Sequence, residues 1–387
     1  MPVVVTIVVL VMVAAVRRWS FDCIKPFLCW IALIVCCVSE ATTPSQDLDF
    51  IYHQILDNHP GIYNQQDPEF LNNLQNSYKI AKERISESRV EEHARQVISS
   101  FVKGFNDTHC WMSWNSSKKP IDTIKKTDSL YIKKIKKDIY WIRLPTFDLN
   151  KDQKKGYQRI LRTLPKIQKN ANIVFDLRGN QGGNSGYATK ISDTLFGEGY
   201  TSQKRREAYQ NTFIDWRVSP DNIQHLRNIL IMEHIDWVEQ VLAGMEESQR
   251  KNQNYYREPG YLDDANTKAS LLPHNTILNH DYRVFCIIDG SNVSAVLDFI
   301  DDIKLMTKNV VLIGKKTKAD RLYMEVRGVS LPSSQGQLFF PIKVYRNRIR
   351  GDNIPYMPDV FYTKNLSNTK ALVQFITDMI LGNRGNG

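Results

Sequence analysis

Residues 173–184 read Ile-Val-Phe-Asp-Leu-Arg-Gly-Asn-Gln-Gly-Gly-Asn, and this stretch decides the fold. A short apolar run, residues 173–175, passes at once into a turn that carries two adjacent glycines. Tyr187, Ile191 and Leu195 then recur at the four-residue spacing of a helix. The pattern predicts a buried strand, a glycine turn and a helix, which is the repeating unit of an α/β protein.

Further segments fit the same architecture. Residues 284–288 form a second apolar run, Asp289 and Gly290 form a second turn, and a helix is expected from about Ser294 to Met306. Residues 310–313 predict a third buried strand. Upstream, partly alternating segments predict a half-buried antiparallel pair of strands and a helix, at 129–135, 138–144 and 151–168.

The rest of the chain is mainly helical in pattern. Residues 46–105 have the apolar spacing of helices and predict a small N-terminal helical cap. Residues 220–275 combine a long helical pattern at 223–245 with a polar loop, and they predict an insertion that could serve as a lid. The expected divisions are therefore 1–41, 42–109 and 110–387, with the insertion at about 220–275 inside the last.

Residues 1–41 predict an export signal. The apolar runs at 2–16 and 27–38 are both shorter than the ~18–20 residues that a membrane span requires. Basic residues precede the second run, and Ser39-Glu40-Ala41 offers the small residues of a cleavage site. We expect an exported protein, periplasmic or secreted. The alternative is membrane association through an N-terminal anchor built from both runs.

Composition excludes several classes of protein. The chain has 387 residues, of which 42% are hydrophobic and 24% charged, and its formal net charge is +10. The basic residues are scattered and no nucleic-acid-binding module is recognisable, so we expect no nucleic acid partner. Beyond residue 41 only Cys110 and Cys286 remain, too few for a disulfide framework. No Cys/His cluster has metal-ligand spacing, so we expect neither metal nor cofactor.

Three segments carry candidate chemistry. Ser294 follows a tight turn at a helix N-terminus, where free amides could stabilise an anionic intermediate, although serine is also simply a good helix cap. Gly182 and Gly183 allow a ligand to approach the backbone closely. His109 lies in the sequence Asn-Asp-Thr-His, where a lone histidine is more often structural than catalytic.

Taken together and in this order, the three segments resemble the family of tail-specific and tricorn-type serine peptidases. The Asp-Leu-Arg-x-Asn-x-Gly-Gly string is the most specific element, and the resemblance spans roughly residues 46–375. It implies a crotonase/ClpP-like core of ββα units and hydrolysis of polypeptides through an acyl-serine intermediate. It also implies Ser294 as nucleophile, His109 as base, and oxyanion donors on the amides of Gly182 or Gly183 and of Ala295.

The chain departs from the family pattern at the residue that would act as general base. Tail-specific members use a lysine about two dozen residues after the serine, but Asp320 stands at that place here and Lys318 lies two positions early. A serine–histidine arrangement is therefore the better fit, with Asp320 or Glu325 as the orienting acid. The stretch from Trp114 to Asp176 also leaves little room for a PDZ module that would bind the substrate tail.

The sequence thus predicts an exported serine peptidase of α/β fold that acts on polypeptides. An esterase on the same scaffold and a non-enzymatic binding protein are the alternatives. Neither the physiological substrate nor the oligomeric state follows from the sequence.

Overall fold

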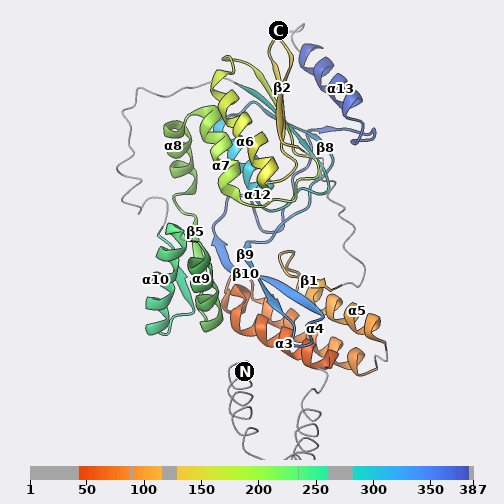
Figure 1. Cartoon of the computed structure of the whole chain (residues 1–387), viewed down its shortest axis with the longest axis vertical. Helices are drawn as coiled ribbons and strands as arrows, with labels where there is room; N and C mark the ends of the chain where they lie inside the picture. Colours follow the sequence, from red (N-terminus) through yellow and green to blue (C-terminus); the bar gives the residue numbers. More distant parts are fainter. Residues whose placement is uncertain (1–42, 88–89, 116–128, 234, 260–281, 383–387) are drawn as a thin grey trace, which may run out of the picture.

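A computed structural model describes residues 43–87, 90–115, 129–233, 235–259 and 282–382. These residues form two bodies stacked along the long axis of the molecule, each built around its own sheet (Figure 1). The predicted leader at 1–41 lies outside the described residues. Within the described ranges, no helix is long and apolar enough to cross a membrane.

The upper body contains a six-stranded sheet in the order β11-β8-β7-β4-β3-β2. All neighbouring pairs are parallel except β2 and β3, which are antiparallel as expected. The strands are β2 (Tyr131–Lys136), β3 (Ile139–Arg143), β4 (Asn172–Asp176), β7 (Arg283–Ile288), β8 (Val310–Gly314) and β11 (Val360–Phe361).

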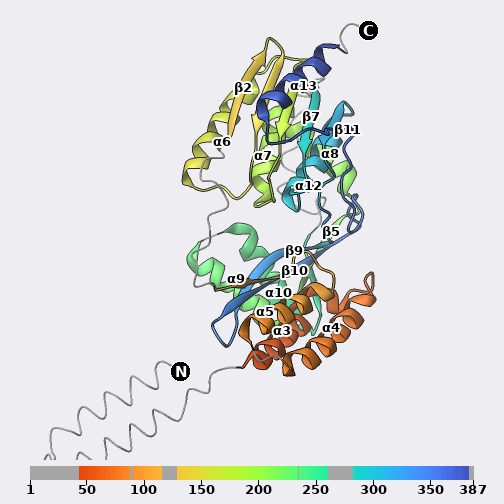
Figure 2. The same ribbon diagram turned by 90° about the vertical axis from the view of Figure 1, so that its right-hand side faces the viewer.

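Helices cover both faces of this sheet. One face packs against α6 (Lys151–Thr163), α7 (Ser185–Phe196) and α12 (Ala295–Met306), and the other against α13 (Thr369–Gly382). Because side chains alternate along a strand, Phe175 faces the first group and Val174 faces α13. Figure 2 shows the helices in layers around the strands. The α/β class predicted from the sequence is confirmed.

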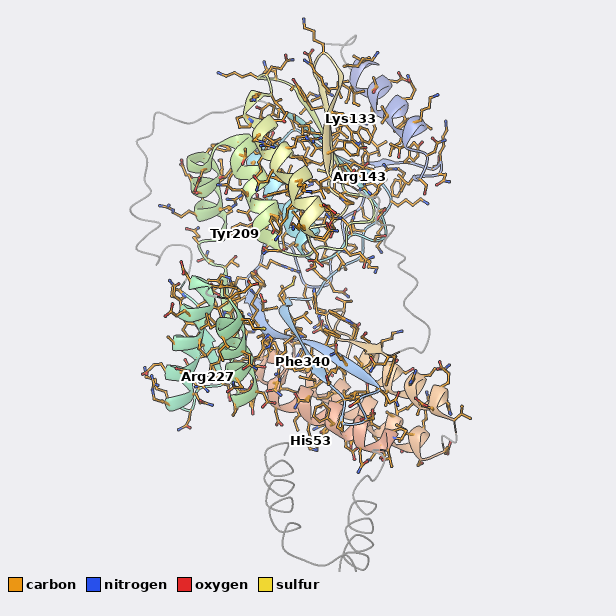
Figure 3. The ribbon with its side chains drawn as sticks, in the orientation of Figure 1. His53, Lys133, Arg143, Tyr209, Arg227 and Phe340 are labelled. Carbon is orange, nitrogen blue, oxygen red and sulfur yellow. The ribbon has the colours of Figure 1, made fainter. Side chains whose placement is uncertain are left out.

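The lower body contains a five-stranded antiparallel sheet that packs against helices from two parts of the chain. Its strands are β1 (Trp111–Trp114), β5 (Phe213–Arg217), β6 (Tyr255–Arg257), β9 (Tyr323–Ser330) and β10 (Gly336–Arg346). Its helices are α3 (Pro44–Asn58), α4 (Glu69–Ser86), α5 (Glu91–Gly104), α9 (Pro220–Met232) and α10 (Asp236–Arg250), with a 3-10 turn η3 at Pro60–Tyr63. Figure 3 marks Phe340 in this sheet and Arg143 in the upper one. The N-terminal helices and the insertion therefore share one core with strands from residue 111 onward.

Three elements differ from the sequence prediction. The helix expected at 151–168 ends at Thr163 and continues as a 3-10 turn, because Pro165 has no N–H to extend the α-helix. The helix expected at 223–245 is two helices, α9 and α10, that pack on one another. Strand β3 is buried at every residue rather than half-buried, since helices cover both faces of its sheet. The connector α8 (Glu198–Tyr209) completes the upper body.

Candidate active site

Ser294 occupies a strained turn between β7 and α12. Its φ of 63° and ψ of −136° are unfavourable for any residue with a side chain, and such a conformation costs about 1–3 kcal/mol. Its side chain makes no cap hydrogen bond to the helix. The helix-cap interpretation of this serine therefore does not hold. Ser294 is partly exposed at the N-terminus of α12, and no hydrogen bond of its hydroxyl is recorded among the described residues.

The glycine turn after β4 packs directly on this serine. A Cβ placed on Gly182 would lie 2.9 Å from Ser294 Cβ, 2.8 Å from Val293 O and 3.1 Å from Ala295 N. Its φ of +94° also favours glycine. The two turns are therefore in contact because Gly182 has no side chain.

Two buried asparagines fix the turns to one another. Asn292 Nδ2 donates to Leu177 O at 2.7 Å and to Asn180 O at 3.0 Å. Asn180 Oδ1 in turn accepts the Gly182 N–H at 2.8 Å. Both asparagine side chains are fully buried. Sequence reasoning gave neither a role, although each stands inside a recognised motif.

These bonds decide which amides remain available. The Gly182 N–H is used by Asn180, whereas the N–H groups of Gly183 and Ala295 have no acceptor among the described residues. Gly183 is exposed and has a φ of +127°. Of the two glycine donors left open by the sequence, the geometry favours Gly183.

His109 lies between α5 and β1, and its side chain is 9% exposed. Both ring nitrogens are buried without a hydrogen-bond partner, so His109 is not hydrogen-bonded to Ser294 in this structure. Its backbone N–H donates to Asp107 Oδ1 at 2.9 Å, and that oxygen lies 4.0 Å from Nδ1 of the ring. Asp107 is therefore a carboxylate in direct contact with the candidate base.

Asp107 is itself held by His59, which the sequence did not single out. His59 Nδ1 accepts the Gly61 N–H at 2.9 Å, so Nε2 carries the proton that it donates to Asp107 Oδ2 at 2.9 Å. Burial alone would raise the pKa of Asp107, but its bond to His59 and the nearby histidines hold that pKa below the ordinary value. Burial lowers the pKa of His59. The pair is thus an ionised carboxylate beside a neutral imidazole.

The group formed by His59, Asp107 and Cys110 does not suit a metal ion. Ligand atoms of His59, Asp107 and Cys110 lie within 4.8 Å of one another and are buried. The Nδ1 of His59 already accepts an N–H. Coordination through Nε2 would therefore require an imidazolate, and histidine ligands are ordinarily neutral.

The two acids proposed from the sequence have other partners. Asp320 is fully buried, and its carboxylate binds Arg350 and, at 3.0 Å, Arg348. Glu325 pairs with Lys343 at 3.3 Å. Neither carboxylate contacts His109 in the described residues.

One loop between β8 and β9 connects the segments that precede Ser294 and His109. The Lys318 N–H donates to Asn292 O at 3.0 Å. Arg321 Nη1 donates to Asn106 O at 3.1 Å. The structure therefore brings the serine turn and the histidine segment to the same loop, with Lys318 on the serine side.

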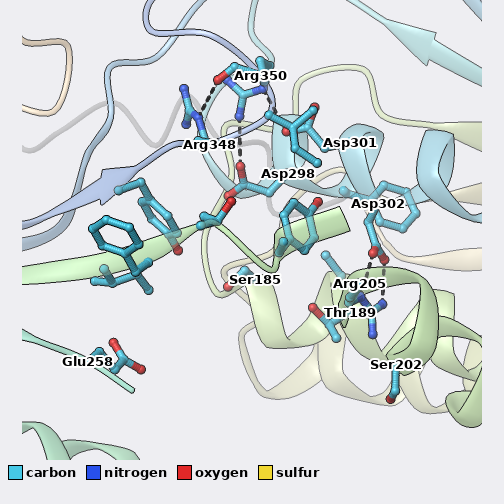
Figure 4. Close-up of a pocket in the computed structure, with 18 of the residues that line it drawn as sticks. Ser185, Thr189, Ser202, Arg205, Glu258, Asp298, Asp301, Asp302, Arg348 and Arg350 are labelled. Atoms are coloured by element: carbon cyan, nitrogen blue, oxygen red, sulfur yellow. Dashed lines mark hydrogen bonds and ion pairs between the residues drawn. The ribbon is translucent and has the colours of Figure 1, made fainter. Parts of the chain in front are cut away.

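A cavity of about 570 Å³ is lined by residues of α7, α8, α12, β5 and β10 (Figure 4). Ser185 and Asp298, from the first turns of α7 and α12, lie in its wall. Asp298 stands four residues after Ser294, one helical turn further along α12. Neither Ser294 nor His109 is among the described residues that line the cavity.

Comparison with known proteins identifies relatives of this chain. The sequence profile described as peptidase family S41 matches residues 138–359, more than half of the chain. No curated protein matches. Mature CPAF complexed with lactacystin has 10% identity and a TM-score of 0.53 over 82% of this chain and 93% of that chain. A lipoprotein from Streptococcus agalactiae has 12% identity and a TM-score of 0.45 over 86% and 96%. At such identities the CPAF match indicates a similar fold alone.

Proposed function

The chain belongs to peptidase family S41 and is a serine-type peptidase, and from this premise we propose that Ser294 is its nucleophile and His109 its base. The observation that carries the proposal is the strained, uncapped Ser294 next to two free amides. A sharp strand-to-helix turn exposes a nucleophilic serine hydroxyl, and backbone N–H groups beside it stabilise the oxyanion of acyl transfer.

Each residue then has a defined role in the proposed reaction. His109 accepts the hydroxyl proton of Ser294 as the oxygen attacks the peptide carbonyl. The N–H groups of Gly183 and Ala295 donate to the oxyanion of the tetrahedral intermediate. The intermediate collapses when His109 returns the proton to the leaving amine, which leaves an acyl-serine. Water then attacks the ester with His109 again as base, and the acid product and free serine are released.

Asp107 is the orienting acid in this proposal, in place of Asp320 or Glu325. It contacts His109 and stays ionised beside neutral His59, whereas the other two acids bind arginine or lysine. An adjacent carboxylate orients an imidazole and stabilises the imidazolium that forms. His109 has no partner at either ring nitrogen in this structure, so the proposal requires it to approach Ser294 when substrate binds, the stage at which catalytic hydrogen bonds commonly tighten.

Export through the predicted leader is part of the proposal. Helix α3 begins at Pro44 with Thr43 as its cap and a complete capping box. The first helix of the described residues therefore begins within a few residues of the expected cleavage site after Ala41. This supports a mature protein that acts on polypeptides in the periplasm or outside the cell.

The test of the proposed activity is digestion of a defined peptide mixture, with products identified by mass spectrometry. We expect new internal peptide termini from the purified mature protein and none from its Ser294→Ala variant. Hydrolysis of simple esters with all peptides left intact would contradict the peptidase proposal and indicate an esterase.

Substitution of Gly182 tests the contact between the two turns. Because a Cβ at Gly182 meets Val293 and Ser294 at under 3.0 Å, Gly182→Ala must displace the serine turn. We expect kcat for a cleaved peptide to fall on the order of 10²–10³-fold, as when one oxyanion donor is lost. Gly199→Ala is the matched control, because a Cβ there meets nothing within 4 Å. A folded Gly182→Ala protein, checked by circular dichroism, with a normal rate would overturn this arrangement.

A further inference from the structure

His59 connects the N-terminal helices to the segment that carries His109. It lies between α3 and η3 and is fully buried. Its ring stacks on Phe70, with centroids 4.3 Å apart and planes within 9° of parallel. It also meets Tyr323 edge to face, at 4.9 Å between centroids. These two contacts fix the plane of the imidazole, so packing sets the direction of its Nε2–H toward Asp107.

The two ring nitrogens of His59 have separate tasks. A residue before proline favours extended backbone, and His59, which precedes Pro60, has φ of −77° and ψ of 134°. In this conformation Nδ1 accepts the Gly61 N–H at 2.9 Å and closes the turn, which leaves the proton on Nε2. Nε2 donates that proton to Asp107 Oδ2 at 2.9 Å. One nitrogen therefore serves the local fold and the other serves the carboxylate.

The carboxylate of Asp107 depends on this donor. Its side chain has no exposed surface, and no lysine or arginine in the described parts of the chain pairs with it. Its other donors there are the backbone N–H of His109 and the thiol of Cys110, 3.7 Å away. Burial is the largest influence on the pKa of Asp107 and would raise it, and the bond from His59 is the largest influence that lowers it. Loss of the bond would therefore favour the neutral acid.

The two oxygens of Asp107 face different partners. Oδ2 accepts the Nε2–H of His59, while Oδ1 accepts the backbone N–H of His109 and lies 4.0 Å from Nδ1 of that ring. A carboxylate that is held at one oxygen presents the other in a fixed direction. His59 therefore determines where Oδ1 stands relative to the imidazole of His109.

We propose that His59 is a positioning residue of the peptidase site, whose Nε2–H holds the Asp107 carboxylate and directs Oδ1 to His109. The inference rests on the proposed function, because His59 has this role only if His109 is the base. No proton leaves His59 in the reaction. The inference places part of the catalytic apparatus in the N-terminal helical region, outside residues 138–359 that match the family profile.

Two substitutions of His59 separate its two nitrogens. The amide oxygen of His59→Asn can replace Nδ1 and accept the Gly61 N–H, but the side chain is too short to donate to Asp107. The longer side chain of His59→Gln can place an amide N–H where Nε2 stood. We expect kcat for a cleaved peptide to fall on the order of 10–100-fold in His59→Asn, the range of a hydrogen bond to a charged group, with KM little changed. His59→Gln should keep most of the wild-type kcat.

The comparison must separate catalysis from folding. Both variants remove the ring between Phe70 and Tyr323, so kcat is expressed per mole of Ser294 that a fluorophosphonate labels at completion, and circular dichroism follows the fold. His53→Asn is the matched control, because His53 is exposed on α3 and its replacement should leave kcat unchanged. A purely structural role would reverse the order and make His59→Asn, which keeps the turn, the faster variant. That order, or an equal effect of the two substitutions, would refute the inference.

Combination with Asp107→Asn shows whether His59 acts through that carboxylate. If it does, His59→Asn should add little to the loss of kcat in Asp107→Asn, because the charge that His59 positions is already absent. Multiplication of the two separate losses would count against the inference, since His59 would then act elsewhere. Absence of any peptide cleavage by the wild type would instead refute the proposed function itself.

Discussion

Ser294→Ala is expected to reduce kcat for peptide hydrolysis on the order of 10⁴–10⁶-fold, because loss of the nucleophile leaves only binding and oxyanion stabilisation. The fold should survive the change. Ser294 makes no cap bond to α12, so its replacement removes no hydrogen bond that stabilises the helix. The measurement is steady-state hydrolysis of a cleaved peptide, with thermal unfolding followed by circular dichroism.

The matched control for this prediction is Ser291→Ala. Ser291 stands three residues earlier in the same turn and is likewise partly exposed. Its backbone N–H donates to Asp289 Oδ1 at 2.8 Å, a bond that alanine retains. We expect nearly normal activity from Ser291→Ala. An active Ser294→Ala together with an inactive Ser291→Ala would identify Ser291 as the nucleophile instead.

His109→Ala should be nearly as damaging as Ser294→Ala, since a serine hydroxyl is a poor nucleophile until a neighbour accepts its proton. Lys318→Ala should keep most of its activity. A lysine base must be neutral at working pH, which requires deep burial, whereas histidine is suited to that role near neutrality without it. An active His109→Ala together with an inactive Lys318→Ala would indicate a serine–lysine dyad.

Asp107→Asn distinguishes a positioning role from a structural one. The amide oxygen can still accept the backbone N–H of His109, but the side chain cannot stabilise an imidazolium by charge, so activity should fall. Because the new NH2 group would face the Nε2–H of His59, folding is checked by circular dichroism. A shift in the midpoint of the pH–rate profile would accompany the loss. A merely structural Asp107 would lower the amount of folded enzyme and leave that midpoint where it was. Asp320→Asn should also leave it unchanged, because Asp320 contacts two arginines rather than His109.

Elements that leave a short continuous pattern in the sequence could be predicted from it. The runs at 173–175 and 284–288, each followed by a glycine turn, became β4 and β7 of a parallel sheet. These signals are local because a buried strand needs only a short apolar run and a turn. The resemblance to tail-specific serine peptidases is confirmed at the level of the family, again because its motif is a continuous string.

Features that depend on contacts between residues far apart in the chain could not be predicted from the sequence. The lower sheet combines strands from residue 111 to residue 346, and no local pattern pairs β1 with β10 or β10 with β5. The Asn180–Asn292 bond spans 112 residues and the His59–Asp107 bond spans 48. The sequence therefore left the orienting acid open between Asp320 and Glu325. It could not reveal that Arg348 and Arg350 bind the first and Lys343 the second.

The central claim is that Ser294 is an activated nucleophile, and covalent labelling tests it most directly. Intact mature protein is treated with a fluorophosphonate at neutral pH, digested, and the modified residue is mapped by mass spectrometry. We predict one phosphonylated residue, Ser294, with labelling lost in Ser294→Ala and strongly slowed in His109→Ala. Peptide hydrolysis by protein that carries no label at Ser294, or whose label maps to another residue, would contradict the account.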